Sequence, residues 1–391
     1  MRIALVTNLY PPIQTGSSFW TRELARYLAA SGDEVVVITS GDAGKTVSKE
    51  ENGFTVYRLP RVLRLPKWNL FLRFDQFHLF HSRRNLEALV SILRNHRVEM
   101  VHQCGQLLDS IYLTRAACRK LALPSLCTLH TKIYHPESRI YDALFRAADA
   151  WWIRRYAMSG FEAVVGLDKP IADYARRVYR PRRLEVVPVC IDDGILDSIQ
   201  AASPEAAPVR ILSVGHVTEM RNRLELLSAV AALRSEGIDL RLMIIGKVLT
   251  EAARDYIRGA CLSEAVEMPG ELPREKVFSY MSASQIHGQW IDYPGLGSST
   301  LEAMAAGLPV LAYGTEDIFG DVPFRHLENI VFVDPYRPET VKCALRRLAS
   351  DPQLRAAIGR RARALVRDHL TWSVTVHKFR ALYRDLIGRR G

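Results

Sequence analysis

Short apolar runs alternate with amphipathic stretches along nearly the whole chain. The apolar runs predict buried strands, and apolar residues spaced three and four apart predict helices that pack on them. In the first half we expect strands at residues 3–8, 34–39, 56–58, 99–103, 125–129, 163–165 and 184–189, with helices at 19–31, 70–95, 108–121, 147–158 and 171–179. In the second half we expect strands at 210–214, 240–245, 266–271, 310–312 and 330–333, with helices at 224–235, 251–260, 274–283, 301–306, 338–349, 352–368 and 373–387.

The alternation falls into two groups, separated by a stretch rich in small residues and proline. Strand and helix alternation is typical of a doubly wound sheet, so each group predicts a Rossmann-like α/β domain. We expect a first domain at residues 1–195, a linker at 196–208, a second domain at 209–372 and a final helix within 373–391. A length of 391 residues agrees with two domains better than with one.

Composition places the chain among globular proteins, with 48% hydrophobic and 24% charged residues. No apolar run reaches the length of a membrane-spanning helix. The first residues enter a strand directly and do not resemble a signal peptide. The six cysteines form no C-x-x-C pair, which argues against a disulfide framework or a zinc site. We therefore expect a cytoplasmic protein.

The formal net charge of +11 is unevenly distributed. Residues 58–97 contain nine Lys/Arg against Asp75 and Glu87, with five aromatic residues among them: Trp68, Phe71, Phe74, Phe77 and Phe80. This mixture indicates peripheral contact with the anionic inner face of a membrane. The alternative is that the aromatic residues belong to the core and the arginines to a solvated face. No nucleic-acid-binding motif accompanies the charge, so nucleic acid is not an expected partner.

The stretch 291–313 carries the clearest chemical signal. A glycine loop leads through Ser298, Ser299 and Thr300, each a favoured N-cap residue, into a short helix that starts at Leu301. Gly307 lies where a helix-ending glycine belongs. Free N–H groups at a helix amino end favour an anion, usually a phosphate. Glu302, one turn along, lies where it can accept hydrogen bonds from sugar hydroxyls.

Residues 301–310, LEAMAAGLPV, resemble the signature segment of the family 4 retaining glycosyltransferases of the GT-B fold. The resemblance implies two Rossmann-like domains facing across a cleft, with the last helix crossing back to the first domain. It implies a nucleotide-sugar donor and no metal cofactor. By resemblance, Glu302 holds the donor ribose and the base lies against residues 268–272, including Met268 and Leu272. The diphosphate then lies on Gly297, Ser298, Ser299 and Thr300.

Two departures from the family pattern concern the donor site. The family glutamate eight residues before Glu302 is replaced by Pro294, and Asp292 is the nearest carboxylate. The family arginine and lysine that grip the diphosphate correspond to His216 and Arg221. Lys247, after the next strand, is a candidate replacement for the missing charge, or else a solvated loop lysine.

On the first domain, Gly16 and Ser17 occupy the loop after the first strand, where the family usually carries two glycines. His130 follows the strand at residues 125–129, and its ring can donate a hydrogen bond to a phosphate. The resemblance implies that these residues contact the donor or the acceptor.

The predicted activity is transfer of a sugar, with retention, to a glycan, lipid-linked or small-molecule acceptor. The resemblance implies a place in the synthesis of cell-surface glycans, glycolipids or related glycoconjugates. Two alternatives remain open. One is a nucleotide-sugar epimerase of the same architecture, and the other is a non-catalytic relative that binds a partner enzyme or a lipid surface.

Overall fold

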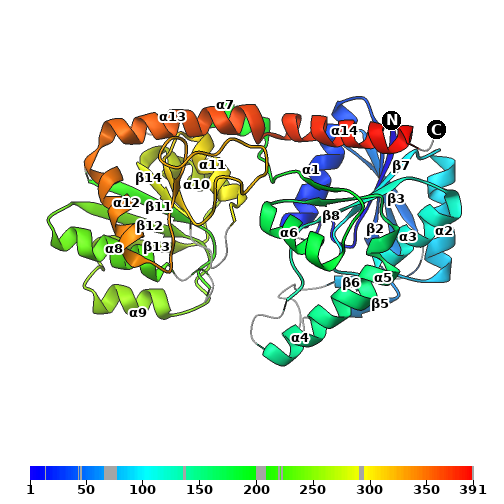
Figure 1. The fold of residues 1–391 in the computed structure, drawn as a ribbon, viewed down its shortest axis with the longest axis horizontal. Helices are drawn as coiled ribbons and strands as arrows, with labels where there is room; N and C mark the ends of the chain where they lie inside the picture. Colours follow the sequence, from blue (N-terminus) through cyan, green and yellow to red (C-terminus); the bar gives the residue numbers. More distant parts are fainter. Residues whose placement is uncertain are drawn as a thin grey trace. The chain divides into compact units, whose positions relative to one another are not determined.

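A computed structural model describes residues 1–13, 15–42, 44, 46–65, 77–134, 138–199, 208–218, 221, 223–289 and 295–389. The chain divides into two compact units (Figure 1). Unit 1 comprises residues 1–188 and 375–391, and unit 2 comprises residues 189–374. The expected first domain ended at residue 195. The structure instead assigns residues from 189 on to unit 2, because Ile191, Ile195 and Ile199 pack in its core.

Unit 1 is built on an eight-stranded sheet with the order β10-β9-β8-β7-β1-β2-β4-β3. All neighbours are parallel except β3 and β4. The strands are β1 Arg2–Val6, β2 Glu34–Gly41, β3 Val47–Glu51, β4 Phe54–Pro60, β7 Met100–Cys104, β8 Ser125–Leu129, β9 Ala163–Gly166 and β10 Leu184–Val186, with a separate pair β5 Leu63–Leu65 and β6 Phe77–Leu79. The helical elements are α1 Gly16–Ala30, α2 Arg83–Asn95, α3 Ser110–Leu121, α4 Arg139–Ala148, a π-helical turn Asp149–Ile153, α5 Arg154–Tyr156, a 3-10 turn Met158–Gly160 and α6 Lys169–Val178.

Unit 2 has a six-stranded, fully parallel sheet with the order β13-β12-β11-β14-β15-β16. The strands are β11 Val209–Val214, β12 Leu240–Ile245, β13 Val266–Gly270, β14 Ile286–Gly288, β15 Val310–Ala312 and β16 Val331–Phe332. The helices are α7 Asp193–Ser198, α8 Leu224–Ser235, α9 Ala252–Gly259, α10 Arg274–Ala283, α11 Ser298–Ala305, α12 Pro338–Ser350 and α13 Pro352–His369. The strand order reverses between β11 and β14, which is where doubly wound sheets bind ligands. These two sheets confirm the predicted pair of Rossmann-like domains.

The last helix, α14 Trp372–Gly388, begins in unit 2 and belongs to unit 1 from Thr375 on. Its Phe379 and Tyr383 are fully buried. The Tyr383 hydroxyl lies 2.7 Å from Nδ1 of His102 on β7, and the Phe379 ring lies 5.7 Å from that of Trp20 on α1. The C-terminal helix therefore completes the core of unit 1, as the predicted crossing-back requires.

Four helix predictions differ from the structure, and one of them is the helix predicted at 301–306, which is α11 and starts at Ser298. The predicted helix at 70–95 is α2 from Arg83 only, and residues 66–76 lie outside the described residues. The helix predicted from residue 19 begins at Gly16, because Thr15 caps it by accepting from the Ser18 N–H at 3.1 Å. The helix predicted at 147–158 is the end of a longer helical run that starts at Arg139.

In unit 2, α13 lies along α11 and fixes its position (Figure 1). The two helices approach most closely where Gly359 of α13 meets Gly307, the residue just after α11. A Cβ atom on Gly359 would lie less than 3.0 Å from the Gly307 carbonyl oxygen, closer than real Cβ contacts. Gly307 itself has φ +80°, which confirms the helix-ending glycine predicted from the sequence.

This contact predicts a large difference between two helical glycines of unit 2. Gly359→Ala is expected to destabilise the protein by about 3 kcal/mol, because backbone must move to admit the methyl group. Gly259→Ala in α9 is the matched control, since a Cβ there meets nothing within 4 Å. It is expected to change stability by at most about 1 kcal/mol, in the stabilising direction. Urea unfolding of both variants measures the difference, and equal midpoints would contradict the proposed contact.

Candidate functional site

The amino end of α11 lies at the switch point between β11 and β14. Ser299 Oγ donates to the Val214 carbonyl, which ends β11, at 3.4 Å, and lies 3.4 Å from Oε1 of Gln289, which follows β14. The N-cap is Gly297 and has no side-chain cap, so the predicted capping by Ser298, Ser299 or Thr300 is wrong. The N–H groups of Ser298 and Ser299 open the helix and have no carbonyl partner among the described residues. They form the kind of positive site that binds a phosphate.

Glu302 lies one turn further along α11, with its side chain only 13% exposed. Its Oε1 accepts a hydrogen bond from Nη2 of Arg274 at 2.6 Å. Arg274 is the first residue of α10 and is 59% exposed, with its guanidinium 5.2 Å from the Phe278 ring centre. Burial raises the pKa of Glu302, and the charge and hydrogen bond of Arg274 oppose that rise. The arginine therefore helps to keep a largely buried carboxylate ionised and holds one of its oxygens in place.

A buried arginine lies under the loop that follows β11. Arg223 is 1% exposed and donates to the carbonyls of Gly215 at 2.9 Å and His216 at 2.8 Å, and to Ser213 Oγ at 3.2 Å. It also donates to the carbonyl of Arg221. Burial, followed by the like charge of Arg221, lowers the pKa of Arg223 to about 10, so it stays protonated at neutral pH. No carboxylate in the described part of the chain pairs with it.

The loop after β11 also touches the loop after β12. His216 is exposed, and its Nδ1 accepts from the Lys247 N–H at 3.2 Å. Gly246 has φ +149°, and a Cβ there would collide with the backbone of Gly215. The Lys247 ammonium lies 3.2 Å from Glu271, and both side chains are more than half exposed. The carboxylate of Glu271 is therefore an exposed ion-pair partner of Lys247.

Other predicted donor residues of unit 2 are less well placed. Thr300 is fully buried, and its N–H donates to the Gly297 carbonyl at 3.0 Å, so it faces the protein interior. Met268 and Leu272 are both partly buried and pack against different core clusters of unit 2. Asp292 and Pro294 lie outside the described residues.

In unit 1, the predicted residues lie at the carboxyl ends of the strands. Gly16 is exposed at the start of α1, and Ser17 Oγ lies 3.1 Å from Thr15 Oγ1. The His130 ring packs edge-on against Trp20, with ring centres 4.8 Å apart. Its Nε2 is buried and has no partner among the described residues. Burial lowers the pKa of His130 to about 4, so the ring is neutral at pH 7 and contributes a hydrogen-bonding group without charge.

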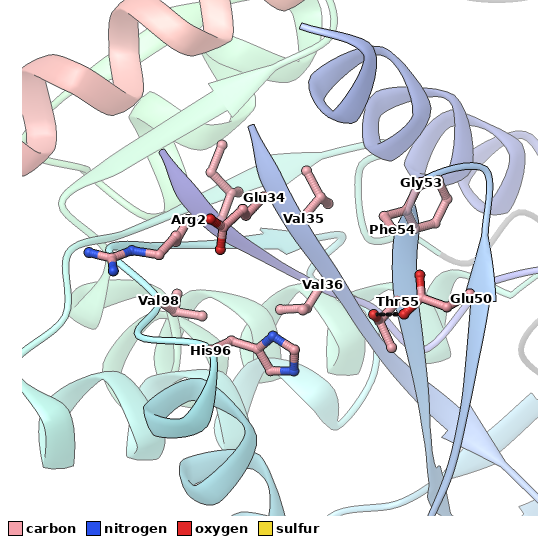
Figure 2. Close-up of a pocket in the computed structure, with 11 residues that line it drawn as sticks. Arg2, Glu34, Val35, Val36, Glu50, Gly53, Phe54, Thr55, His96 and Val98 are labelled. Carbon is pink, nitrogen blue, oxygen red and sulfur yellow. Dashed lines mark hydrogen bonds between the residues drawn. The ribbon is translucent and has the colours of Figure 1, made fainter. Parts of the chain in front are cut away.

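A hollow of about 190 Å³ in unit 1 lies at the amino ends of the strands, whereas the predicted site residues lie at the carboxyl ends (Figure 2). It is lined by the first residues of three parallel strands, Arg2, Glu34 and Phe54, together with His96. Figure 2 also shows Glu50 turned back to Thr55 through a hydrogen bond. Ligands of doubly wound sheets bind beyond the carboxyl ends of the strands, so this hollow is separate from the candidate site.

Sequence reasoning missed three contributors to the candidate site: Arg223, Arg274 and Gln289. Arg274 and Glu302 are 28 residues apart, and no periodicity predicts that they meet. Arg223 lies immediately before α8, where an arginine is normally solvated. The sequence signal that could have identified Arg223 was its position eight residues after Gly215, the glycine that follows the predicted strand at 210–214.

Two family descriptions match the two halves of the chain. Residues 15–194 match "Glycosyltransferase Family 4", and residues 198–365 match "Glycosyl transferases group 1". The 2-deoxystreptamine glucosyltransferase of Streptomyces kanamyceticus is 26% identical over 313 residues, which cover 74% of this chain and 79% of that protein. The MMP alpha-(1->4)-mannosyltransferase of Mycolicibacterium hassiacum is 23% identical and covers 100% of this chain and 99% of its own length.

Similarity to solved structures concerns the fold. The Anabaena protein Alr3699/HepE, solved in complex with UDP, superposes with a TM-score of 0.71 at 14% identity and covers 98% of this chain and 100% of its own. Among the residues described here, none of the helices is long and apolar enough to span a membrane. With both halves matched by glycosyltransferase families and the two Rossmann-like sheets in place, the chain belongs to the glycosyltransferases of the GT-B type.

Proposed function

We propose that the chain transfers a sugar from a nucleoside-diphosphate donor to an acceptor hydroxyl, with retention of the anomeric configuration, as a family 4 enzyme. The observation that carries the proposal is the arrangement at the β11–β14 switch point. The helix N–H groups of Ser298 and Ser299, which have no partner among the described residues, lie beside a loop supported by the buried charge of Arg223. One turn along the same helix is a carboxylate, Glu302, of the kind that binds sugar hydroxyls.

The proposed chemistry is stabilisation of the leaving group. When the glycosidic bond to the donor breaks, negative charge develops on the departing diphosphate. We propose that the amides at the start of α11 and the side chain of Arg221 contact that charge. The guanidinium of Arg223, held by backbone carbonyls beneath the loop, adds a fixed positive charge. A fixed site of this kind stabilises the transition state without reorganising. His216, in place of the family arginine, supplies a hydrogen-bond donor, and Arg223 supplies the permanent charge from beneath the loop.

Glu302 is proposed to bind the ribose of the donor. Arg274 occupies Oε1 of its carboxylate, which leaves Oε2 to accept from a ribose hydroxyl. The acceptor is proposed to bind unit 1 near Gly16 and His130, where the neutral imidazole can hydrogen-bond a sugar or phosphate group. The Anabaena protein of similar fold was solved in complex with UDP and with UDP-glucose, so UDP-glucose is the first donor to test.

The test combines binding and product analysis. UDP at a concentration one hundred times its dissociation constant is expected to stabilise the protein by about 2.7 kcal/mol, visible as a rise in Tm. A panel of nucleotide-sugars, each with and without sugar acceptors, then identifies the donor by release of the nucleoside diphosphate. A protein that binds no nucleoside diphosphate contradicts the proposal and favours a non-catalytic relative. Conversion of a donor to its epimer without an acceptor favours the epimerase alternative.

A further inference from the structure

One helical segment of unit 1 turns its apolar side chains to solvent. The run Arg139–Tyr156 joins α4, the π-helical turn and α5, and Figure 1 shows α4 projecting from the rest of unit 1. No residue of α4 is buried. The exposed fractions are 74% for Ile140, 58% for Leu144, 64% for Trp151 and 48% for Trp152.

The inner side of the same segment is polar, so the usual amphipathic pattern is inverted. Asp149 is 1% exposed and accepts from the hydroxyls of Tyr174 and Tyr179, the latter at 2.6 Å. Asp142, 21% exposed, pairs with Arg146 at 2.8 Å. A surface helix of a globular protein ordinarily presents its apolar stripe to the core. The contacts of Asp149 instead fix the segment with that stripe outward.

The exposed aromatic rings contact one another. Trp151 and Trp152 have ring centres 6.0 Å apart, and Tyr156 lies 4.5 Å from Trp152. Contiguous apolar surface of this kind marks an interaction site. Trp and Tyr are enriched where proteins meet the water–lipid boundary, because one part of the ring system is apolar and another can hydrogen-bond.

The charges on this surface identify the partner. The exposed charged residues of the segment are Arg139, Arg146 and Arg155; Arg146 pairs with the partly exposed Asp142, and Asp149 is buried. The net exposed charge of the segment is therefore positive. A second copy of the chain would bring arginines against arginines, whereas an anionic bilayer supplies opposite charge and apolar depth.

We propose that the Arg139–Tyr156 surface docks unit 1 onto an anionic lipid bilayer, with Ile140, Leu144, Trp151 and Trp152 entering the interface. This docking surface differs from the one predicted at residues 58–97. In that segment Phe80 is fully buried, and Trp68, Phe71 and Phe74 lie outside the described residues. The proposal does not depend on the transfer reaction, since binding to lipid is measured without a donor.

The test is co-sedimentation of the full chain with vesicles of phosphatidylcholine alone or mixed with phosphatidylglycerol. The wild type is expected to partition onto the anionic vesicles, with weaker binding at high salt. The double variant Leu144→Glu/Trp151→Glu is expected to bind at least about ten-fold more weakly, because two inserted side chains become charged. Thermal unfolding checks that the variant keeps its fold, as expected for changes at exposed side chains.

Two control variants separate the competing surfaces. Val47→Glu on β3, where the side chain is 58% exposed like that of Leu144, is expected to bind vesicles as the wild type does. Val62→Glu, at 61% exposure, alters the 58–97 segment and is also expected to leave binding unchanged.

Equal binding by the double variant and the wild type overturns the proposal, as does loss of binding in Val62→Glu alone. Equal wild-type binding to neutral vesicles overturns the charge argument. A wild-type dimer in sedimentation velocity that the double variant converts to monomer, without vesicle binding, assigns the surface to a second copy.

Discussion

Replacing Glu302 with alanine is expected to reduce turnover of the nucleotide-sugar donor strongly while leaving the protein folded. The carboxylate is the group proposed to hold the ribose, and a hydrogen bond to a charged acceptor contributes about 1.5–3 kcal/mol, or roughly ten- to a hundred-fold in kcat/KM, before the misplacement of the donor is counted. The side chain is not part of the apolar core clusters, so the free energy of unfolding should change little. Release of nucleoside diphosphate under single-turnover conditions measures the loss.

The partner of Glu302 provides the control for this prediction. Arg274→Ala removes the ion pair but keeps the carboxylate, and Arg274 is more than half exposed, so solvent already screens the pair. The Arg274 variant is expected to retain turnover within about ten-fold of the wild type. If Glu302→Ala and Arg274→Ala reduce turnover to the same extent, the Glu302 carboxylate acts only through Arg274. Full turnover by Glu302→Ala would show that the donor lies elsewhere.

Replacing Arg223 with methionine is expected to weaken binding of the nucleoside diphosphate by about a hundred-fold. The buried guanidinium supplies a permanent positive charge under the phosphate-binding loop and holds the carbonyls of Gly215 and His216. Charge-assisted hydrogen bonds of this kind contribute about 1.5–3 kcal/mol each. Isothermal titration with UDP measures the affinity. Arg223→Lys keeps the positive charge but loses the forked set of guanidinium donors. Its affinity for UDP is expected to lie between that of the wild type and that of Arg223→Met.

Arg223→Met is expected to lower stability as well as affinity, and a second buried arginine provides the control that separates the two effects. Methionine leaves carbonyl groups without donors, so Arg223→Met is also expected to lower the free energy of unfolding by about 2–4 kcal/mol. Arg355 on α13 is equally buried, at 3% exposed, and its guanidinium also donates to backbone carbonyls, those of Leu348 and Ala349. Arg355→Met should therefore lose stability and keep its affinity for UDP. A similar affinity loss in both variants would trace the effect to general destabilisation.

Local patterns allowed most of the fold to be predicted. Apolar runs and helical periodicity located most of the strands and helices of both units, and the helix-ending role of Gly307 followed from its place in the sequence. Strands β3 and β14 and helix α7 were not predicted. The elements that were misplaced depend on information beyond the local pattern. Residues 16–18 were taken as loop because glycine and serine favour loops, yet the Thr15–Ser18 capping contacts start the helix there. The segment Arg139–Tyr156 could not be oriented from its pattern, because amphipathicity gives two faces and does not say which one is covered.

The sequence predicted where the candidate site lies better than it predicted which side chains form it. The position of Ser298, Ser299 and Glu302 followed from the helix that carries them. The pairing of Glu302 with Arg274 and the burial of Arg223 arise from contacts between elements that are distant in sequence, which a single sequence does not reveal. Thr300 was included because it belongs to the same turn, but the 100° step between helix residues carries its side chain to the buried face.

The assignment of residues 375–391 to unit 1 has a consequence for biosynthesis. Residues 1–188 leave the ribosome long before Phe379 and Tyr383 do, and at about 5–20 residues per second the delay is on the order of ten seconds or more. During that interval Trp20 and His102 lack the aromatic partners that cover them in the finished molecule. Unit 2, which is continuous in sequence, can complete its fold first, so the half that is made first is the half that matures last.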